Sequence, residues 1–169
     1  YTGIKTNLLF FTKGAPTENV WYYEHPYPAG VKNYNKTKPI RIEEFNVEKA
    51  WWGVEADGFA SRVENERAWK FDFRGLYEKA IADATPYWDE AKRLESKVRE
   101  FKAQASALKE ELQKATDLAL QKQIKQKIAS CNQSIAETTA AASQQQRTGD
   151  GIYWPIYNLD LKNPHVGEQ

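Results

Sequence analysis

Two regular stripes of apolar residues dominate the chain between residues 85 and 147. Apolar residues recur at alternating steps of four and three from Tyr87 to Leu112, which is the heptad spacing of a helix that buries one face against another helix. A second, weaker stripe runs from Leu120 to Ala142 after a short polar break. Because a short connection makes consecutive helices antiparallel neighbours, the pattern predicts an antiparallel helical hairpin over residues 85–147.

Local signals set the expected ends of this hairpin. Thr85 precedes Pro86, and threonine at the N-cap followed by proline at the first helical position is a common helix start. The Gly149-Asp150-Gly151 triplet is expected to end the second helix, since glycine favours helix C-termini. We expect residues 148–169 to form an extended tail that returns to the end of the hairpin where it began.

The first 24 residues carry the pattern of strands. The continuous apolar run Leu8–Phe11 is typical of a strand buried on both faces, and Val20–Tyr23 follows as an aromatic-rich strand. Two strands alone are only marginally stable in water. We therefore expect residues 1–24 to form a strand hairpin at the edge of a larger sheet, whose other strands would precede Tyr1.

Residues 25–84 form the next segment, which is rich in aromatic residues and lacks a long periodic element from His25 to about Gly75. Proline and glycine interrupt the segment repeatedly, and a short helix is expected near Phe45–Trp52. Because disordered segments contain few aromatic residues, we expect an ordered wrap with the tail packed near Trp51 and Trp69. The predicted fold class is mainly α with a small β remnant (α+β).

The composition fits one domain, or a small domain with an appendage. The chain has 169 residues and a formal net charge of +1, which excludes a global basic field that would attract nucleic acid. One cysteine cannot form a disulfide within the chain. No apolar run approaches the roughly 20 residues of a membrane-spanning helix. We expect a cytoplasmic protein with no membrane partner.

No motif for catalysis, for a metal or for a phosphate-bearing cofactor is present in the sequence. His25 and His165 each lie beside a proline, and we interpret both as exposed loop residues. Cys131 has no partner at metal-ligand spacing and lies in the second stripe as a small core residue. Neither glycine-rich phosphate motif occurs. The sequence thus predicts no catalytic, cofactor-binding or metal-binding residue in this chain.

One cluster of basic residues is a candidate for contact with DNA. The segment from Val31 to Arg41 contains no acidic residue. Positive charges and amide groups of this kind hold phosphates, although a solvated surface loop has the same composition. The candidate DNA-backbone residues are Lys5, Lys32, Lys36, Lys38 and Arg41.

The heptad stripes allow two interpretations. In one, each stripe is buried by the other helix of the hairpin. In the other, a partner helix packs onto the pair, because a two-helix arm buries little apolar surface by itself. The candidate partner-helix residues are Leu94, Val98, Phe101, Leu108, Leu112, Ile124, Ile128 and Ile135.

Several segments resemble the methylation (M) subunits of type I restriction-modification systems. The opening segment Gly3–Gly14, with the sequence GIKTNLLFFTKG, resembles the stretch that closes the catalytic domain in that family. The other similar segments are Val20–Tyr23, Tyr34–Ile40, Glu64–Lys70 and Tyr157–Pro164. The resemblance covers the first half and the tail, while the hairpin is similar in architecture.

The resemblance implies an N6-adenine DNA methyltransferase that uses S-adenosylmethionine and has a seven-stranded sheet with helices on both faces. Members of the family assemble with a specificity (S) subunit, a second M subunit and a restriction (R) subunit on double-stranded DNA. Their catalytic Asn-Pro-Pro-Phe/Tyr motif and their Phe-x-Gly-x-Gly cofactor motif are absent from this sequence, and His165 follows Asn163-Pro164. The resemblance therefore implies a C-terminal fragment of an M subunit, inactive alone, with the cofactor bound elsewhere in the parent subunit.

The expected role of this region is subunit assembly by docking onto the specificity subunit, together with contact to the DNA backbone. Two alternatives stay open. A free-standing coiled-coil adaptor explains the heptads but not the strand motifs, and a complete small enzyme would bind S-adenosylmethionine by itself.

Overall fold

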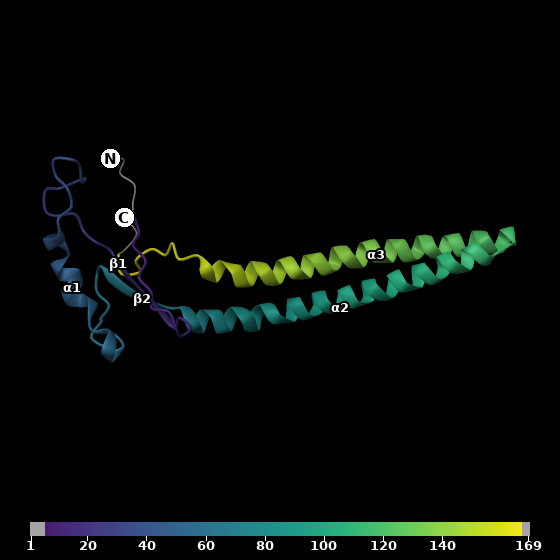
Figure 1. The fold of residues 1–169 in the computed structure, drawn as a ribbon, viewed down its shortest axis with the longest axis horizontal. Coiled ribbons are helices and arrows are strands. Elements are labelled where there is room, and N and C mark those ends of the chain that lie inside the picture. The colour runs from purple at the N-terminus through teal and green to yellow at the C-terminus, as the bar shows by residue number, and fades with distance from the viewer. Residues whose placement is uncertain (1–5, 167–169) are drawn as a thin grey trace. The chain divides into compact units, whose positions relative to one another are not determined.

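The computed structural model describes residues 6–166 (Figure 1). The chain divides into two compact units, one made of Tyr1–Gly75 with Asp160–Gln169 and the other of Leu76–Leu159. Most of the regular structure is helical, and the sheet found among the described residues has two antiparallel strands. The predicted fold class, mainly α with a small β part, is confirmed.

The sheet of the first unit pairs β1 (Asn19–Tyr23) with β2 (Ala68–Asp72). Tyr22 lies opposite Trp69, and their rings stack with centroids 4.9 Å apart and planes 4° apart. Trp69 is buried, as is its neighbour Ala68. Because directly opposed aromatic side chains stabilise a strand pair beyond the area that they bury, this pair forms the centre of the first unit.

Leu8–Phe11 does not form the predicted strand. Its four side chains are 65% to 83% exposed, and β1 pairs with β2 instead. A strand buried on both faces requires neighbouring strands and cover on each side, and no strand within residues 6–166 pairs with this segment. The prediction of a strand hairpin was therefore wrong for Leu8–Phe11, its first strand. It was correct for Val20–Tyr23, which lies in β1.

The short helices of the first unit lie between β1 and β2 along the chain. They are the 3-10 helix η1 (Ile42–Phe45), the α-helix α1 (Asn46–Trp52) and the 3-10 helix η2 (Glu55–Asp57). Trp51 at the end of α1 lies against Trp21 and Tyr23 of β1, with ring centroids 5.5 Å and 5.0 Å apart. The short helix predicted near Phe45–Trp52 is confirmed, and its aromatic end packs on the sheet.

The C-terminal tail packs against the loop that precedes β2, within the first unit. Asn163 is buried, and its Nδ2 donates to the carbonyl oxygen of Glu66 at 2.7 Å. Its Oδ1 accepts from the backbone N–H of His165 at 2.9 Å. Because a buried amide is costly unless its donors and acceptors are bonded, the bond to Glu66 fixes the tail on the wrap, and the bond from His165 forms a turn within the tail.

The second unit contains two long helices that lie side by side and antiparallel in Figure 1. They are α2 (Phe73–Lys114), which begins in the first unit, and α3 (Leu118–Tyr153), which is followed by the 3-10 helix η3 (Trp154–Tyr157). Asp117 caps α3 by accepting from the backbone N–H groups of Ala119 and Leu120. The predicted helical hairpin is confirmed.

Both helices run past their predicted ends. α2 continues through Pro86, and the Thr85 hydroxyl donates to the carbonyl oxygen of Ile81 at 2.7 Å instead of capping a helix start. α3 continues through Gly149 and Gly151, so the stretch predicted to be extended after Gly151 is helical as far as Tyr157. Tertiary packing outweighs the local breakers here, since Ala80, Ala84 and Gly149 are all buried.

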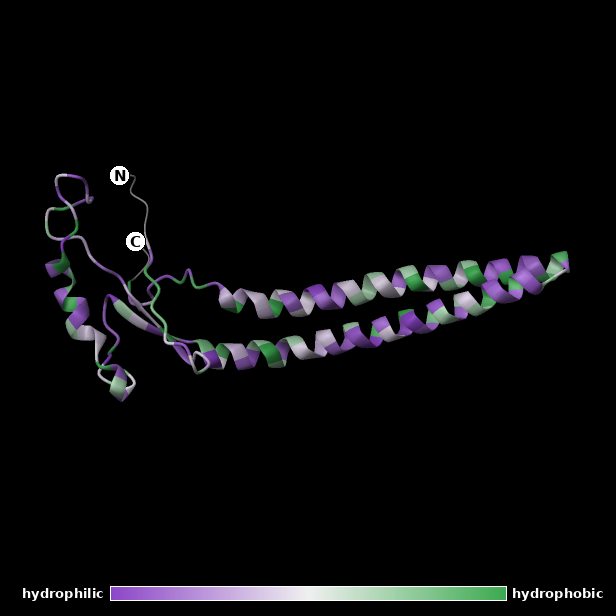
Figure 2. Ribbon diagram, viewed as in Figure 1, coloured by the Kyte–Doolittle hydropathy of each residue, from purple (hydrophilic) through white to green (hydrophobic). Residues whose placement is uncertain are grey.

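The seam between the helices is built from small side chains. Hydrophobic and hydrophilic residues alternate along both helices in Figure 2. Tyr87 and Leu120 are the first residues of the two predicted apolar stripes. Both side chains are exposed, so the prediction was wrong at these two positions. The residues buried in this unit are Ala80, Ala84, Ala91, Val98, Ala105, Ile124, Ala142 and Gly149.

Candidate functional site

The segment Val31–Arg41, called the basic loop below, presents cationic side chains to solvent. Its exposed cations are Lys32, Lys36, Lys38 and Arg41. None of these four forms a salt bridge within residues 6–166. Lys5, the fifth predicted DNA-backbone residue, lies outside the described residues.

Asn35 holds the basic loop in a tight turn. Its Oδ1 accepts from the backbone N–H groups of Thr37 at 3.0 Å and Lys38 at 2.8 Å. The backbones of Asn35 and Lys38 exchange two further hydrogen bonds of 3.0 Å and 3.1 Å. Lys32 and Lys38 line a hollow of about 310 Å³ together with Asn33 and Asn35, and Lys36 is not among its lining residues. The structure thus gathers two of the predicted cations around amide groups.

A network of side chains ties the basic loop to η1 and α1. The Tyr34 hydroxyl donates to Glu44 Oε2 at 2.5 Å and lies 3.1 Å from His25 Nε2. The other ring nitrogen of His25 lies 2.7 Å from Glu48 Oε1. The imidazole also stacks on Phe45, with ring centroids 4.5 Å apart. The prediction that His25 is an exposed loop residue was wrong, because the side chain is half-buried between these groups.

This network changes the acidity of two of its members. Burial, followed by the hydrogen bond to Glu44, raises the pKa of Tyr34 to about 12. The same hydrogen bond is the main cause that lowers the pKa of Glu44, and the backbone N–H of Arg41 adds to it by donating to Glu44 Oε1 at 2.9 Å. Glu44 is therefore held by Tyr34 and the backbone rather than by a lysine of the basic loop.

The guanidinium group of Arg62, in the first unit, packs against aromatic side chains. The guanidinium carbon of Arg62 lies 4.7 Å from the ring centroid of Trp52 and 3.8 Å from that of Phe59. Its Nε donates to the carbonyl oxygen of Trp52 at 2.8 Å, and burial lowers the pKa of Arg62. Cation–π contacts of this kind stabilise a folded segment, so Arg62 serves the structure of the wrap and is not available to a ligand.

The partner-helix candidates lie in the seam between α2 and α3. Val98 and Ile124 are buried, and the other candidates are half-buried. The seam of the hairpin is therefore largely covered by the chain itself. The half-buried members are Leu94, Phe101, Leu108, Leu112, Ile128 and Ile135.

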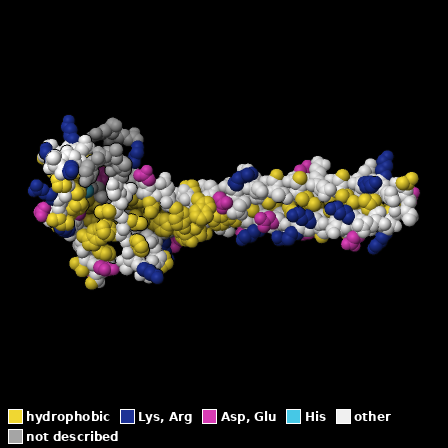
Figure 3. All heavy atoms as spheres, turned by 45° about the horizontal axis from the view of Figure 1, so that its top comes forward, with side chains coloured by type: hydrophobic (Ala, Val, Ile, Leu, Met, Phe, Trp, Pro, Cys, Tyr) yellow, Lys and Arg dark blue, Asp and Glu magenta, His cyan; other side chains and the backbone are white. Residues whose placement is uncertain are grey.

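The base of the hairpin is closed by aromatic side chains. Trp88 of α2 donates from Nε1 to Asp150 Oδ1 of α3 at 3.1 Å. Tyr153 packs edge-on against Trp88, with centroids 5.4 Å apart, and its hydroxyl lies 2.7 Å from that of Tyr157. This hydrogen bond is the main cause that raises the pKa of Tyr153. These contacts join α2 and α3 at the base of the hairpin, where hydrophobic side chains gather in Figure 3.

The sequence pattern missed the network around His25. Glu44 and Glu48 are four residues apart, but His25 and Tyr34 have no regular spacing to them, and only the fold brings the four together. Within residues 6–166, no group of three or more His, Cys, Asp or Glu side chains is arranged to hold a metal ion. No helix in this part of the chain is long and apolar enough to cross a membrane.

A comparison with curated proteins identifies a relative of part of the chain. The type I restriction enzyme EcoEI methylase subunit of Escherichia coli is 73% identical over 70 residues, which are 41% of this chain and 14% of that protein. The chain therefore matches much less than two thirds of the relative's length. No family model matches the chain. No solved structure matches it either.

Over these 70 residues the chain is similar to a methylase subunit of a type I restriction enzyme, and the family resemblance predicted from its sequence motifs is confirmed.

Proposed function

We propose that this chain forms the C-terminal region of a type I M subunit and serves subunit assembly and DNA-backbone contact without catalysing a reaction itself. In the whole subunit, a methyl group would pass from S-adenosylmethionine to N6 of adenine in double-stranded DNA. The partners would be the specificity subunit, a second M subunit and the restriction subunit. The identity with a methylase subunit supports the parent activity, and the missing catalytic and cofactor motifs support the inactivity of this region.

The observation that carries the assembly role is the length of the hairpin. α2 has 42 residues and α3 has 36, so α3 alone extends over ~54 Å at the usual helical rise. A two-helix arm of this length has more surface than its own seam buries. Large helical surfaces that a domain does not use internally are common sites of subunit docking.

The exposed apolar run near the start of the chain supports a larger parent fold. Leu8, Leu9, Phe10 and Phe11 are side by side in the sequence and all exposed. Contiguous exposed apolar residues mark surfaces that another element covers. In the proposed parent subunit, this run would lie against the sheet of the methyltransferase domain.

The basic loop supports the DNA role. Its four described cations form no salt bridge within residues 6–166, and the neighbouring Glu44 is engaged by Tyr34 and by the Arg41 backbone. Lys32 and Lys38 share a hollow with amide groups that can donate to phosphate oxygens. A preformed turn with unpaired cations can bind a polyanion at little cost in conformational entropy.

The assembly role is tested by replacing residues 92–147 with a short flexible linker in the full-length M subunit. We expect the variant to bind S-adenosylmethionine normally but to lose co-purification with the specificity subunit. A variant that still binds both S-adenosylmethionine and the specificity subunit would contradict the assembly role. Analytical ultracentrifugation of the chain alone tests the adaptor alternative, which requires self-association through the hairpin.

The DNA role is tested by changing Lys36→Gln and Lys38→Gln together in the assembled enzyme. Each lost phosphate contact reduces the slope of log affinity against log salt by about 0.9, so we expect binding to weaken and the slope to fall by about 1.8. The matched control changes Lys122→Gln and Lys127→Gln, which are exposed on α3. An unchanged slope in the Lys36/Lys38 variant would remove the DNA role.

A further inference from the structure

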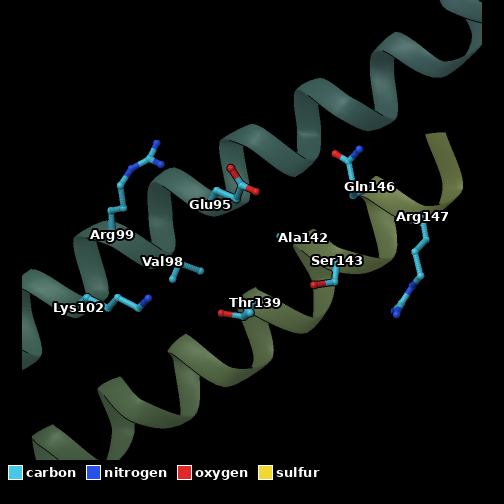
Figure 4. Close-up of a pocket in the computed structure, with 9 residues that line it drawn as sticks. All are labelled: Glu95, Val98, Arg99, Lys102, Thr139, Ala142, Ser143, Gln146 and Arg147. Carbon is cyan, nitrogen blue, oxygen red and sulfur yellow. The ribbon is translucent and has the colours of Figure 1, made fainter. Parts of the chain in front are cut away.

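A groove runs between α2 and α3, where residues 95–102 of α2 face residues 139–147 of α3 (Figure 4). It encloses about 490 Å³. Val98 of α2 and Ala142 of α3 form its floor, and they are 8% and 6% exposed. Thr139 and Ser143 lie beside Ala142. Packed helices have axes about 8–10 Å apart, and small side chains at the contact permit the shorter distances. The side chains of this floor therefore allow a third helix to pack against α2 and α3.

The rim of the groove carries an excess of positive charge. Its cations are Arg99 and Lys102 of α2 and Arg147 of α3, against the single acid Glu95. In Figure 4, Arg99 extends from α2 on the side away from α3, and Arg147 extends from α3 on the side away from α2. The groove is therefore flanked by cations on both sides.

These cations are not neutralised within the chain. Among the described residues, none of the three forms a salt bridge. Arg99 donates to Ser96 Oγ at 2.8 Å and Arg147 donates to Gln144 Oε1 at 3.3 Å, so their side-chain partners are neutral. Other cations of the hairpin do have acidic neighbours. These pairs are Lys79 with Asp83, Lys92 with Asp89 and Arg93 with Glu90.

We infer that this groove is the face of the hairpin that meets the partner, and that the partner element is an α-helix with a narrow apolar stripe bordered by Asp or Glu. The inference rests on the proposed assembly function and adds the face and the chemistry of the contact. An apolar stripe matches the floor at Val98 and Ala142, and acidic borders match the rim cations. DNA would match the rim but not the floor, because its backbone offers no apolar surface to bury there.

Reversing the charge of the rim cations tests whether the partner binds this face of the hairpin. The variant Arg99→Glu, Lys102→Glu and Arg147→Glu is made in the full-length M subunit, and binding of the purified specificity subunit is measured by calorimetry. We expect the affinity to fall by about tenfold or more, because three rim cations become repulsive toward an acidic helix. The matched control reverses Lys97, Lys122 and Lys127, which are exposed and do not line the groove, and should bind within about threefold of the unchanged subunit.

Photo-crosslinking identifies the partner element without depending on the stability of the charge-reversed subunit. A photoreactive residue at Ser143, which lines the groove, should crosslink to one segment of the specificity subunit. That segment should be helical and carry Asp or Glu beside small apolar residues. The same probe at Ser130, which is exposed and outside the groove, should give little product. Crosslinks from Ser143 to DNA, or stronger crosslinks from Ser130, would overturn the inference.

The outcomes separate this inference from the proposed function. If the linker variant loses assembly but the groove reversal binds normally, the hairpin docks through another face and the inference is wrong while the proposed function stands. If the control reversal weakens binding as much as the groove reversal, the charge specificity is wrong. If the linker variant still assembles, both the inference and the assembly role fail.

Discussion

The indole of Trp88 lies directly against the backbone of Gly149. A Cβ atom at residue 149 would be 2.6 Å from Nε1 of Trp88 and 2.7 Å from Cδ1. The indole Nε1 also donates to Asp150 Oδ1. The glycine therefore lies inside a helix not to end it but to leave space for an aromatic side chain of the other helix, which fixes the register of α2 and α3 at the base of the hairpin.

Gly149→Ala should destabilise the chain although glycine is a poor residue inside a helix. Replacing helical glycine by alanine normally stabilises by roughly 0.5–1 kcal/mol, but here the new methyl group displaces the indole, at a cost of typically 1–3 kcal/mol. The control is Gly151→Ala, where nothing lies within 4 Å of the new Cβ. Urea denaturation should show a lower midpoint for the first variant and an equal or higher midpoint for the second. A stabilising Gly149→Ala would contradict the close approach.

Pro86→Ala should stabilise α2. Proline has no N–H to donate within the helix, and its ring crowds the preceding turn, so an interior proline costs ~3 kcal/mol relative to alanine. α2 continues through Pro86, which means that this cost is borne in the folded state. We expect a higher denaturation midpoint and an unchanged m-value. A lower midpoint would show that the proline ring itself is required for packing.

Tyr34 should ionise later than an ordinary tyrosine. Its pKa in the folded chain is about 12, against 10.0 for the free side chain. Since the folded state favours the protonated phenol, this contribution to stability is complete below pH 10 and is lost as the pH rises from 10 towards 12. Ultraviolet titration of the nine tyrosines should show a late fraction that is smaller in Tyr34→Phe. If the absorbance lost in Tyr34→Phe comes from the part of the curve near pH 10 and not from the late part, the network is refuted.

Asn163→Ala should loosen the tail. The change removes the bond to the Glu66 carbonyl and the bond from the His165 N–H, which the buried Asn163 side chain makes. The net contribution of one such hydrogen bond to stability is about 0.5–1.5 kcal/mol. Hydrogen exchange at the His165 amide should accelerate, while the exposed control Asn132→Ala on α3 should leave it unchanged. Protection that persists in Asn163→Ala would show that other contacts hold the tail.

The periodic part of the fold was predictable, and the aperiodic part was not. Heptad spacing from Ala91 to Leu112 predicted a helix because burial of one helical face repeats every 3.5 residues. The alternation in Trp69-Lys70-Phe71 is the signal for β2, but three residues are too few to distinguish a strand from a loop. Leu8–Phe11 gave a clear strand pattern, yet no strand within the described residues pairs with it.

The candidate site was likewise predictable from the sequence in one part and not in another. The charge of the basic loop is visible in the sequence, because four cations without an acid between them need no fold to be recognised. The bracing of that loop by His25, Tyr34 and Glu44 depends on contacts between residues without regular spacing. The groove on the hairpin depends on which cations of two antiparallel helices come to lie at the same level.

The helical hairpin, the charge of the basic loop and the resemblance to a type I methylase subunit follow from the amino-acid sequence alone, since they depend on local periodicity and on residue identity. Three features required the folded chain: the pairing of β1 with β2, the passage of α2 and α3 through Pro86 and Gly149, and the position of Arg99 and Arg147 beside one groove. These features depend on which distant residues meet. At Gly149 the space needed by the Trp88 indole outweighs the local preference of glycine for a helix end.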